Sequence, residues 1–372
     1  MLSNLRANII LLFAGIATFV VMGAGQSLYG PTLPVLSRDF SIGLGEAGLL
    51  ISAHWIGCAV GVGTMFLASH RVAPRDSAGT MLIGAAMIAA GIGWIFTLIG
   101  GFALGVGYGA ATVMFNRRFL IEFGAQGPAM VSLVNALFGV GAIGAPLVFV
   151  ALGSRVSVSY ALVAGLALIT AFVAFRLPPA TKQAAASAGQ FQLHFGILAL
   201  GMAAIATEAT LIGLGPVALI ALGQTEVQAA KLLSAFFVTF LVIRLILAAF
   251  SNVVSPLNLL IGALIAAAGS CLITVMISPT IGFIALGACA GLFFPPYFVC
   301  ATGLMGDDPR VTPTIISSGL VGGIIAPLLM GLILRNMGDT AFFWVVAAVD
   351  ITAAILAIAF ARRLRPAMTL AE

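Results

Sequence analysis

The sequence predicts an all-α membrane protein of about twelve transmembrane helices, built as two pseudo-symmetric six-helix bundles. Of its 372 residues, 62% are hydrophobic and 7% are charged, and the mean hydropathy is +1.20. Soluble chains carry about 25% charged residues. Apolar runs of about 20 residues follow one another along the chain, and each can span a hydrocarbon core about 30 Å thick. Short segments also repeat at a nearly constant offset, which indicates two related halves.

The apolar runs are rich in Ala, Leu, Ile, Val and Gly, and they lack the apolar–polar alternation of a membrane β-barrel. We therefore assign each run to a helix. The expected helices cover residues 7–30, 45–69, 77–97, 99–118, 128–152, 157–176, 194–221, 228–249, 256–277, 280–304, 311–334 and 340–362.

A polar segment separates the sixth expected helix from the seventh. RLPPATKQAAASAGQFQLH, at 176–194, is rich in Pro, Ala, Ser and Gln, a composition typical of flexible linkers. We predict an N-terminal six-helix half over 1–176, a cytoplasmic linker over 177–193 and a C-terminal six-helix half over 194–372.

The two halves carry matching segments in the same order. LISAHW at 50–55 matches LLSAFF at 232–237, and ALG at 103–105 recurs at 285–287, both at an offset of 182. GAIGAPL at 141–147 matches GGIIAPL at 322–328, at an offset of 181. The nearly constant offset indicates parallel repeats, which in transporters place the solute site between the halves near the midplane.

The positive charges predict the orientation of the chain. With a cytoplasmic N-terminus, eleven Lys and Arg residues lie inside and four outside. We therefore expect a multi-pass protein of a bacterial-type inner (plasma) membrane with both termini cytoplasmic. The net charge of +5 then reflects the inside loops. The bilayer is the expected surrounding, nucleic acid is not an expected partner, and we expect a monomer.

Three charged residues stand out because they lie well inside expected spans, where charge is costly and therefore indicates function. Glu208 lies midway along the seventh helix and Arg244 past the middle of the eighth. We assign both to the solute pathway, with mutual neutralisation as the structural alternative. Glu208 could carry a proton or accept hydrogen bonds from a solute hydroxyl. Asp350 lies on the twelfth helix, which we expect to be peripheral, and receives no role.

Neutral polar side chains complete the expected substrate-binding set, because amides, phenols and imidazoles bind hydroxyl-rich solutes by directional hydrogen bonds. For His54, a satisfied core residue is the alternative. The aromatic residues near them could pack a sugar ring or only one another. The polar candidates are Gln26, Tyr29, His54, Asn116 and Asn135; the aromatic ones are Trp55, Tyr108, Phe138 and Tyr297.

Enzyme motifs are missing from the sequence, which contains no GxxxxGK[ST], HExxH or CxxC. The four cysteines lie in apolar runs without metal-ligand spacing. We expect no catalytic residue, no metal and no cofactor.

The whole chain resembles the major facilitator superfamily, and four segments resemble the fucose permease and glucose/galactose permease branch of sugar:proton symporters. The segments are LVNALFGVGAIGAPLV at 133–148, GYGAATVMFN at 107–116, TEATLIGLGP at 207–216 and AAKLLSAFFVTFLVIR at 229–244. The resemblance implies transport of a small polar solute, a sugar or sugar-like polyol, by alternating access with proton coupling.

The sequence departs from that branch in its first half. An Asp of the first helix and a Glu of the fourth, which serve coupling and sugar binding in the fucose permease type, align with Gly30 and Thr112. Glu208 is then the remaining coupling candidate, and facilitated diffusion is the alternative. Gly101 stands where drug antiporters carry an Arg, which argues against that class. Transport of organic anions or amphiphilic drugs stays open, as does a non-transporting membrane sensor on the same fold.

Overall fold

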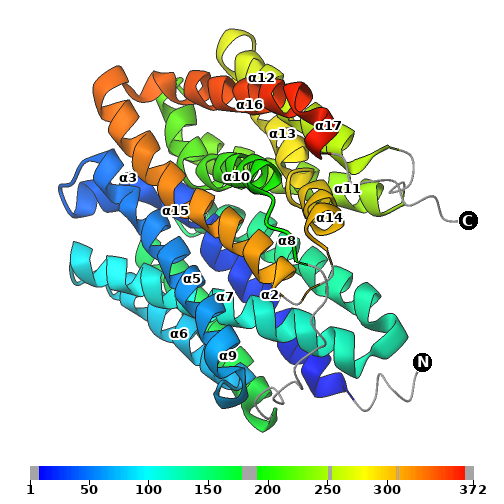
Figure 1. Ribbon diagram of the computed structural model, residues 1–372. Coiled ribbons are helices and arrows are strands. Elements are labelled where there is room, and N and C mark those ends of the chain that lie inside the picture. Colours follow the sequence, from blue (N-terminus) through cyan, green and yellow to red (C-terminus); the bar gives the residue numbers. More distant parts are fainter. Residues whose placement is uncertain (1–7, 178–190, 250–253, 307, 309, 365–372) are drawn as a thin grey trace, which may run out of the picture. The chain divides into compact units, whose positions relative to one another are not determined.

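The computed structural model describes residues 8–177, 191–249, 254–306, 308 and 310–364, and within these ranges the secondary structure is entirely helical (Figure 1). The chain divides into two compact units, Met1–Gln183 and Ala184–Glu372. The predicted linker over 177–193 lies mostly outside the described residues.

The first unit contains six spans, of which the first is interrupted at Leu28 and the second at Gly48, near its start. Its helices are α2 (Ile9–Ser27), α3 (Tyr29–Asp39), α4 (Leu44–Ala47), α5 (Leu49–Ala68), α6 (Pro74–Ala90), α7 (Trp94–Glu122), α8 (Gly127–Ala151) and α9 (Val156–Val173).

The second unit also contains six spans, and its interruption lies in the tenth span of the chain. Its helices are α10 (Phe195–Ala221), α11 (Glu226–Ala249), α12 (Pro256–Met276), α13 (Pro279–Gly291), α14 (Phe294–Met305), α15 (Val311–Met337), α16 (Phe342–Ala359) and α17 (Ala361–Leu364).

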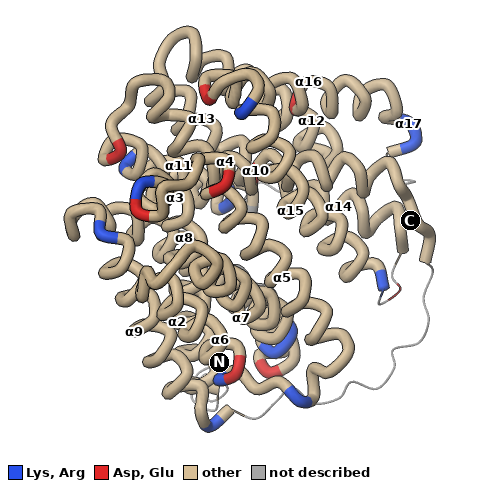
Figure 2. The backbone as a smooth tube through the Cα atoms, turned by 90° about the vertical axis from the view of Figure 1, so that its left-hand side faces the viewer, with Lys and Arg blue, Asp and Glu red and all other residues tan. Residues whose placement is uncertain are grey.

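The predicted membrane-spanning fold is confirmed. Within the described residues, eleven helical segments are long and apolar enough to cross a membrane. The twelfth span is α6, whose 17 residues reach the lower limit for a membrane-spanning helix. Most charged residues lie in loops or at helix ends, as Figure 2 shows, and few lie within the spans.

Several predicted helix boundaries are wrong. The first helix does not stop at residue 30, because Pro31 lies in the first turn of α3, where a backbone N–H has no helical partner. The third ends at Ala90 rather than 97, since Gly91 adopts a left-handed φ of 60°. The fourth therefore begins at Trp94 and runs on to Glu122.

Glycines set the distance between α5 and α7. A Cβ at Gly57 or Gly61 of α5 would overlap a backbone carbonyl of α7, and a Cβ at Gly105 or Gly109 of α7 would overlap one of α5. Each helix thus presents a GxxxG pair to the other, the arrangement that lets helix backbones approach closely in lipid. The carbonyl facing Gly105 is that of His54, so this packing also positions a candidate site residue.

The second unit repeats these contacts at the offset found in the sequence. Gly287 of α13 faces the carbonyl of Phe236 as Gly105 faces that of His54, an offset of 182 for both residues. Gly322 of α15 faces the Met202 carbonyl of α10, just as Gly141 of α8 faces the Val20 carbonyl of α2. The short sequence matches therefore mark real structural equivalents, which is the predicted pseudo-symmetry of the two bundles.

Candidate functional site

His54 lies at the centre of a buried polar and aromatic cluster in the first unit. Its side chain is fully buried on α5, and Nδ1 lies 3.0 Å from the Tyr29 hydroxyl of α3. The Tyr108 and Trp55 rings pack edge-on against the imidazole, with centroids 5.2 and 5.7 Å away. We name these four residues the His54 cluster. Because Tyr29 and His54 come from different spans, only the fold brings them together.

One nitrogen of His54 lacks a regular hydrogen bond. The Gly101 carbonyl lies close enough to interact electrostatically with the imidazole. Nε2 nevertheless makes no hydrogen bond of ordinary geometry among the described residues. The side-chain oxygen of Gln26, on α2, is likewise buried without a partner in the described part of the chain. Buried polar atoms are nearly always paired. The Ser159 and Tyr160 hydroxyls of α9 are also buried without a regular hydrogen bond among the described residues, and of these four groups Gln26 and His54 are the two predicted from the sequence to bind solute.

Asn116 and Asn135 form a second pair in this unit. Asn135 Nδ2 lies 3.4 Å from Asn116 Oδ1 and 2.8 Å from the Val131 carbonyl, so much of its hydrogen-bonding capacity is used within α8. Asn116 follows Tyr108 by eight residues on α7, a separation of about 12 Å along the helix axis. The structure therefore brings the asparagines to each other, as a group distinct from the His54 cluster.

Arg244, in the second unit, is held by the interruption of the tenth span. Its Nε donates to the Gly291 carbonyl over 3.1 Å. That carbonyl has no helical donor, because the residue four positions later is Pro295, which lacks an N–H. The guanidinium also lies over the Phe240 ring, 4.0 Å from its centroid. Proline thus frees a backbone acceptor that orients Arg244, the cation in the second half of α11.

Glu208 lies in the middle of α10, within electrostatic range of the Arg244 guanidinium. Its Oε2 is buried and has no hydrogen-bond partner among the described residues. The two residues predicted to act together therefore belong to one electrostatic environment. A carboxylate oxygen without a partner in a membrane interior carries a large desolvation cost, which a solute hydroxyl or a proton would relieve.

Asp350, which the sequence left without a role, is fully buried on α16. Its Oδ1 accepts a hydrogen bond of 2.7 Å from the Thr207 hydroxyl of α10, and its Oδ2 has no partner in the described structure. Thr207 directly precedes Glu208 in α10. The carboxyl group of Asp350 is therefore bound to the residue next to Glu208. Sequence analysis missed Thr207, because a threonine in an apolar helix usually bonds its own backbone.

We predict that Thr207→Val destabilises the protein by about 1–3 kcal/mol, the cost of leaving a buried polar group without its partner. The valine keeps the shape of the side chain while Asp350 loses its hydrogen bond. Thermal unfolding in detergent measures the effect. Thr210→Val is the matched control, since the Thr210 hydroxyl bonds the Ala206 carbonyl of its own helix over 2.7 Å. Equal unfolding temperatures for the two variants would contradict the prediction.

Metal-ligating side chains do not gather in the described part of the chain, where no group of three or more His, Cys, Asp or Glu residues is close enough to hold an ion. The polar groups that do gather are hydrogen-bonding groups set among aromatic rings. Together with two units of six spans, they define a polytopic membrane protein of the transporter class.

A family model described as Major Facilitator Superfamily matches residues 15–318. The chain belongs to the major facilitator superfamily, whose members are membrane transporters for small-molecule solutes and not enzymes. No curated protein sequence matches the chain.

Solved structures share the fold over nearly the whole chain. A D-xylose–proton symporter superposes with a TM-score of 0.78 at 13% identity, covering 96% of this chain and 98% of the other. A nucleoside transporter gives 0.76 at 14%, covering 94% and 99%. The fucose:proton symporter of E. coli gives 0.63 at 18%, covering 96% and 98%. At these identities the likeness concerns the fold alone, whereas the family model confirms the predicted superfamily.

Proposed function

We propose that this protein is a secondary transporter that moves a sugar or sugar-like polyol by alternating access. The observation that carries the proposal is that three of the predicted site residues each have a buried polar atom without a regular hydrogen bond among the described residues. These atoms are Gln26 Oε1, His54 Nε2 and Glu208 Oε2, three of six such atoms in the described part of the chain. An acceptor, a ring nitrogen and a carboxyl oxygen match the hydroxyl groups of such a solute, which donate and accept.

The aromatic members of the His54 cluster support a sugar rather than an ion. Trp55 and Tyr108 lie edge-on to each other, with centroids 6.4 Å apart, and Phe138 of α8 continues the series beside Tyr108 at 6.4 Å. Ligand sites combine such apolar faces with a few polar groups that fix the orientation of the ligand. The C–H faces of a sugar ring would pack on the aromatic side chains, and its hydroxyls would bond the polar groups.

The structural relatives transport related solutes. Their titles name xylose, fucose and nucleosides, each of which carries a hydroxylated ring or chain. Two of the titles also name a proton as the coupled ion. We propose Glu208 as the residue that binds solute and couples a proton here, with Arg244 beside it and Tyr29, Asn116 and Asn135 adding hydrogen bonds. The expected setting is a bacterial-type inner membrane, with a monomer whose termini are cytoplasmic.

A ligand panel tests this proposal. The purified protein is heated with sugars, polyols, nucleosides, organic anions and amphiphilic drugs, because a ligand of the folded state raises the unfolding temperature by mass action. The best ligand is then used in counterflow with liposomes. Stabilisation by one sugar or polyol together with counterflow supports the proposal. Stabilisation only by anions or drugs overturns the solute class, and binding without counterflow indicates a sensor.

We predict that His54→Phe still folds, although the Tyr29 hydroxyl loses its partner, and that it weakens solute binding about 2- to 10-fold, the range for one net hydrogen bond. The second unit shows that phenylalanine fits this environment, since the equivalent position is the fully buried Phe236. Titration of the stabilising sugar measures the change. His70→Phe, at an exposed histidine, is the control. Unchanged affinity in a folded His54→Phe protein would remove His54 from the site.

A further inference from the structure

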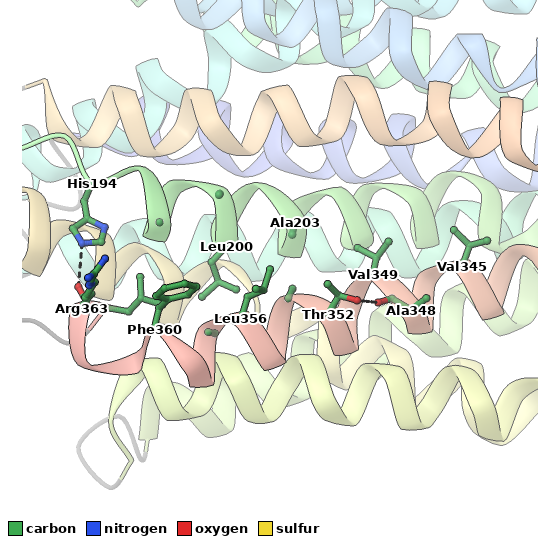
Figure 3. Close-up of a pocket in the computed structure, with 15 residues that line it drawn as sticks. His194, Leu200, Ala203, Val345, Ala348, Val349, Thr352, Leu356, Phe360 and Arg363 are labelled. Atoms are coloured by element: carbon green, nitrogen blue, oxygen red, sulfur yellow. Dashed lines mark hydrogen bonds between the residues drawn. The ribbon is translucent and has the colours of Figure 1, made fainter.

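An apolar groove runs between α10 and α16 in the second unit, apart from Glu208 and Arg244. Figure 3 shows His194 and Arg363 at one end and Val345 at the other. Its volume is about 920 Å³. A second cavity of about 260 Å³, bounded by α10, α15 and α16, adjoins it and shares Ala203, Val345 and Val349.

The groove offers almost no hydrogen-bonding group along its length. The Thr352 hydroxyl donates to the Ala348 carbonyl of its own helix over 2.6 Å, as the dashed line in Figure 3 marks. In the adjoining cavity, the Thr207 hydroxyl is already given to Asp350. The remaining wall consists of aliphatic and aromatic side chains such as Leu356 and Phe360, which are 52% and 50% exposed. A polar solute would find no partners here, whereas a hydrocarbon chain would.

The polar end of the groove is built around His194. Its Nδ1 accepts from the Ile197 N–H over 3.3 Å, so the imidazole proton is on Nε2, which donates to the Arg363 carbonyl over 3.0 Å. This bond ties the start of α10 to α17. The neutral histidine leaves Arg363, and the neighbouring Arg362, as the exposed cations at this end. The positive N-terminus of α10 lies beside them.

We propose that the groove binds an anionic phospholipid, with an acyl chain along α16 and the phosphate against Arg363 and the start of α10. The sixteen residues from Val345 to Phe360 extend over about 22 Å, more than half of a hydrocarbon core about 30 Å thick. The groove is therefore long enough to hold a lipid acyl chain that extends from one membrane surface to the middle of the core. The predicted orientation places the cations in the cytoplasmic leaflet, where basic residues beside membrane helices attract anionic lipids.

Native mass spectrometry of the delipidated full-length protein tests the proposal with dioleoylphosphatidylglycerol, dioleoylphosphatidylcholine and glycerol 3-phosphate. We expect the anionic lipid to bind at least about fivefold more tightly than the zwitterionic one, and glycerol 3-phosphate not to compete. Arg363→Gln should remove the preference for the anionic lipid. Ala199→Trp, which places a ring in the groove from an exposed position, should weaken both lipids.

Two controls match these variants. Arg335→Gln removes an exposed cation at the end of α15, and Ala266→Trp adds a ring on an exposed face of α12 outside the groove. Neither should change lipid binding. Equal binding of the two lipids by the unmodified protein, or an unchanged preference in Arg363→Gln, overturns the headgroup assignment. Unchanged lipid binding in Ala199→Trp overturns the assignment of the groove as the site of the acyl chain. Competition by glycerol 3-phosphate alone would show a phosphate site in place of a lipid site.

Discussion

Glu208→Gln is expected to lower solute affinity about 10- to 100-fold, because a hydrogen bond to an ionised group contributes about 1.5–3 kcal/mol. Glutamine keeps the length of the side chain but removes its charge and one acceptor. The solute would then lose its strongest partner in the second unit. Titration of the stabilising ligand, followed by thermal unfolding, measures the change.

The control for this variant is Glu46→Gln, at an exposed carboxylate on the short helix α4. It should leave affinity and flux unchanged. Proton coupling is tested in the same liposomes: if Glu208 carries the proton, a pH gradient drives uptake by the unmodified protein but not by Glu208→Gln, while counterflow persists in both. Gradient-driven uptake by Glu208→Gln would remove Glu208 as the coupling residue, and no response in either protein would indicate facilitated diffusion.

Gly105→Ala is expected to destabilise the first unit by about 3 kcal/mol or more, at the upper end of the cost of overpacking. The added Cβ would overlap the His54 carbonyl oxygen. Since the obstacle is backbone, no side-chain rotation relieves the overlap, and α5 must move away from α7. That movement displaces His54, so solute binding should fall together with the unfolding temperature.

Gly63→Ala is the matched control on α5. Nothing lies within 4 Å of a Cβ at Gly63. Alanine there should be neutral or stabilising by up to about 1 kcal/mol, because it has the higher helix propensity. Gly287→Ala should reproduce the Gly105→Ala defect in the second unit, where Phe236 provides the facing carbonyl. Similar unfolding temperatures for Gly63→Ala and Gly105→Ala would show that close backbone contact does not hold the two helices together.

The offset between the repeats predicted which positions of the two halves are structurally equivalent. Matches of three to seven residues at offsets of 181 and 182 identified positions that the structure places in equivalent glycine–carbonyl contacts. This worked because close helix packing in lipid needs glycine at particular positions, and both halves kept those positions. Helix ends were less predictable, since Pro31 can begin a helix as well as end one.

The sequence by itself determined the membrane setting, the helical class, the pairing of two related halves and the identity of the ionisable residues in the spans. Each of these depends on composition or on local spacing. Only the tertiary structure decided which polar groups are partners: Tyr29 with His54, Thr207 with Asp350, and Arg244 with the Gly291 carbonyl. These pairs join different helices. Their contacts depend on how the spans are rotated and packed against each other, which the order of residues within any one span does not specify.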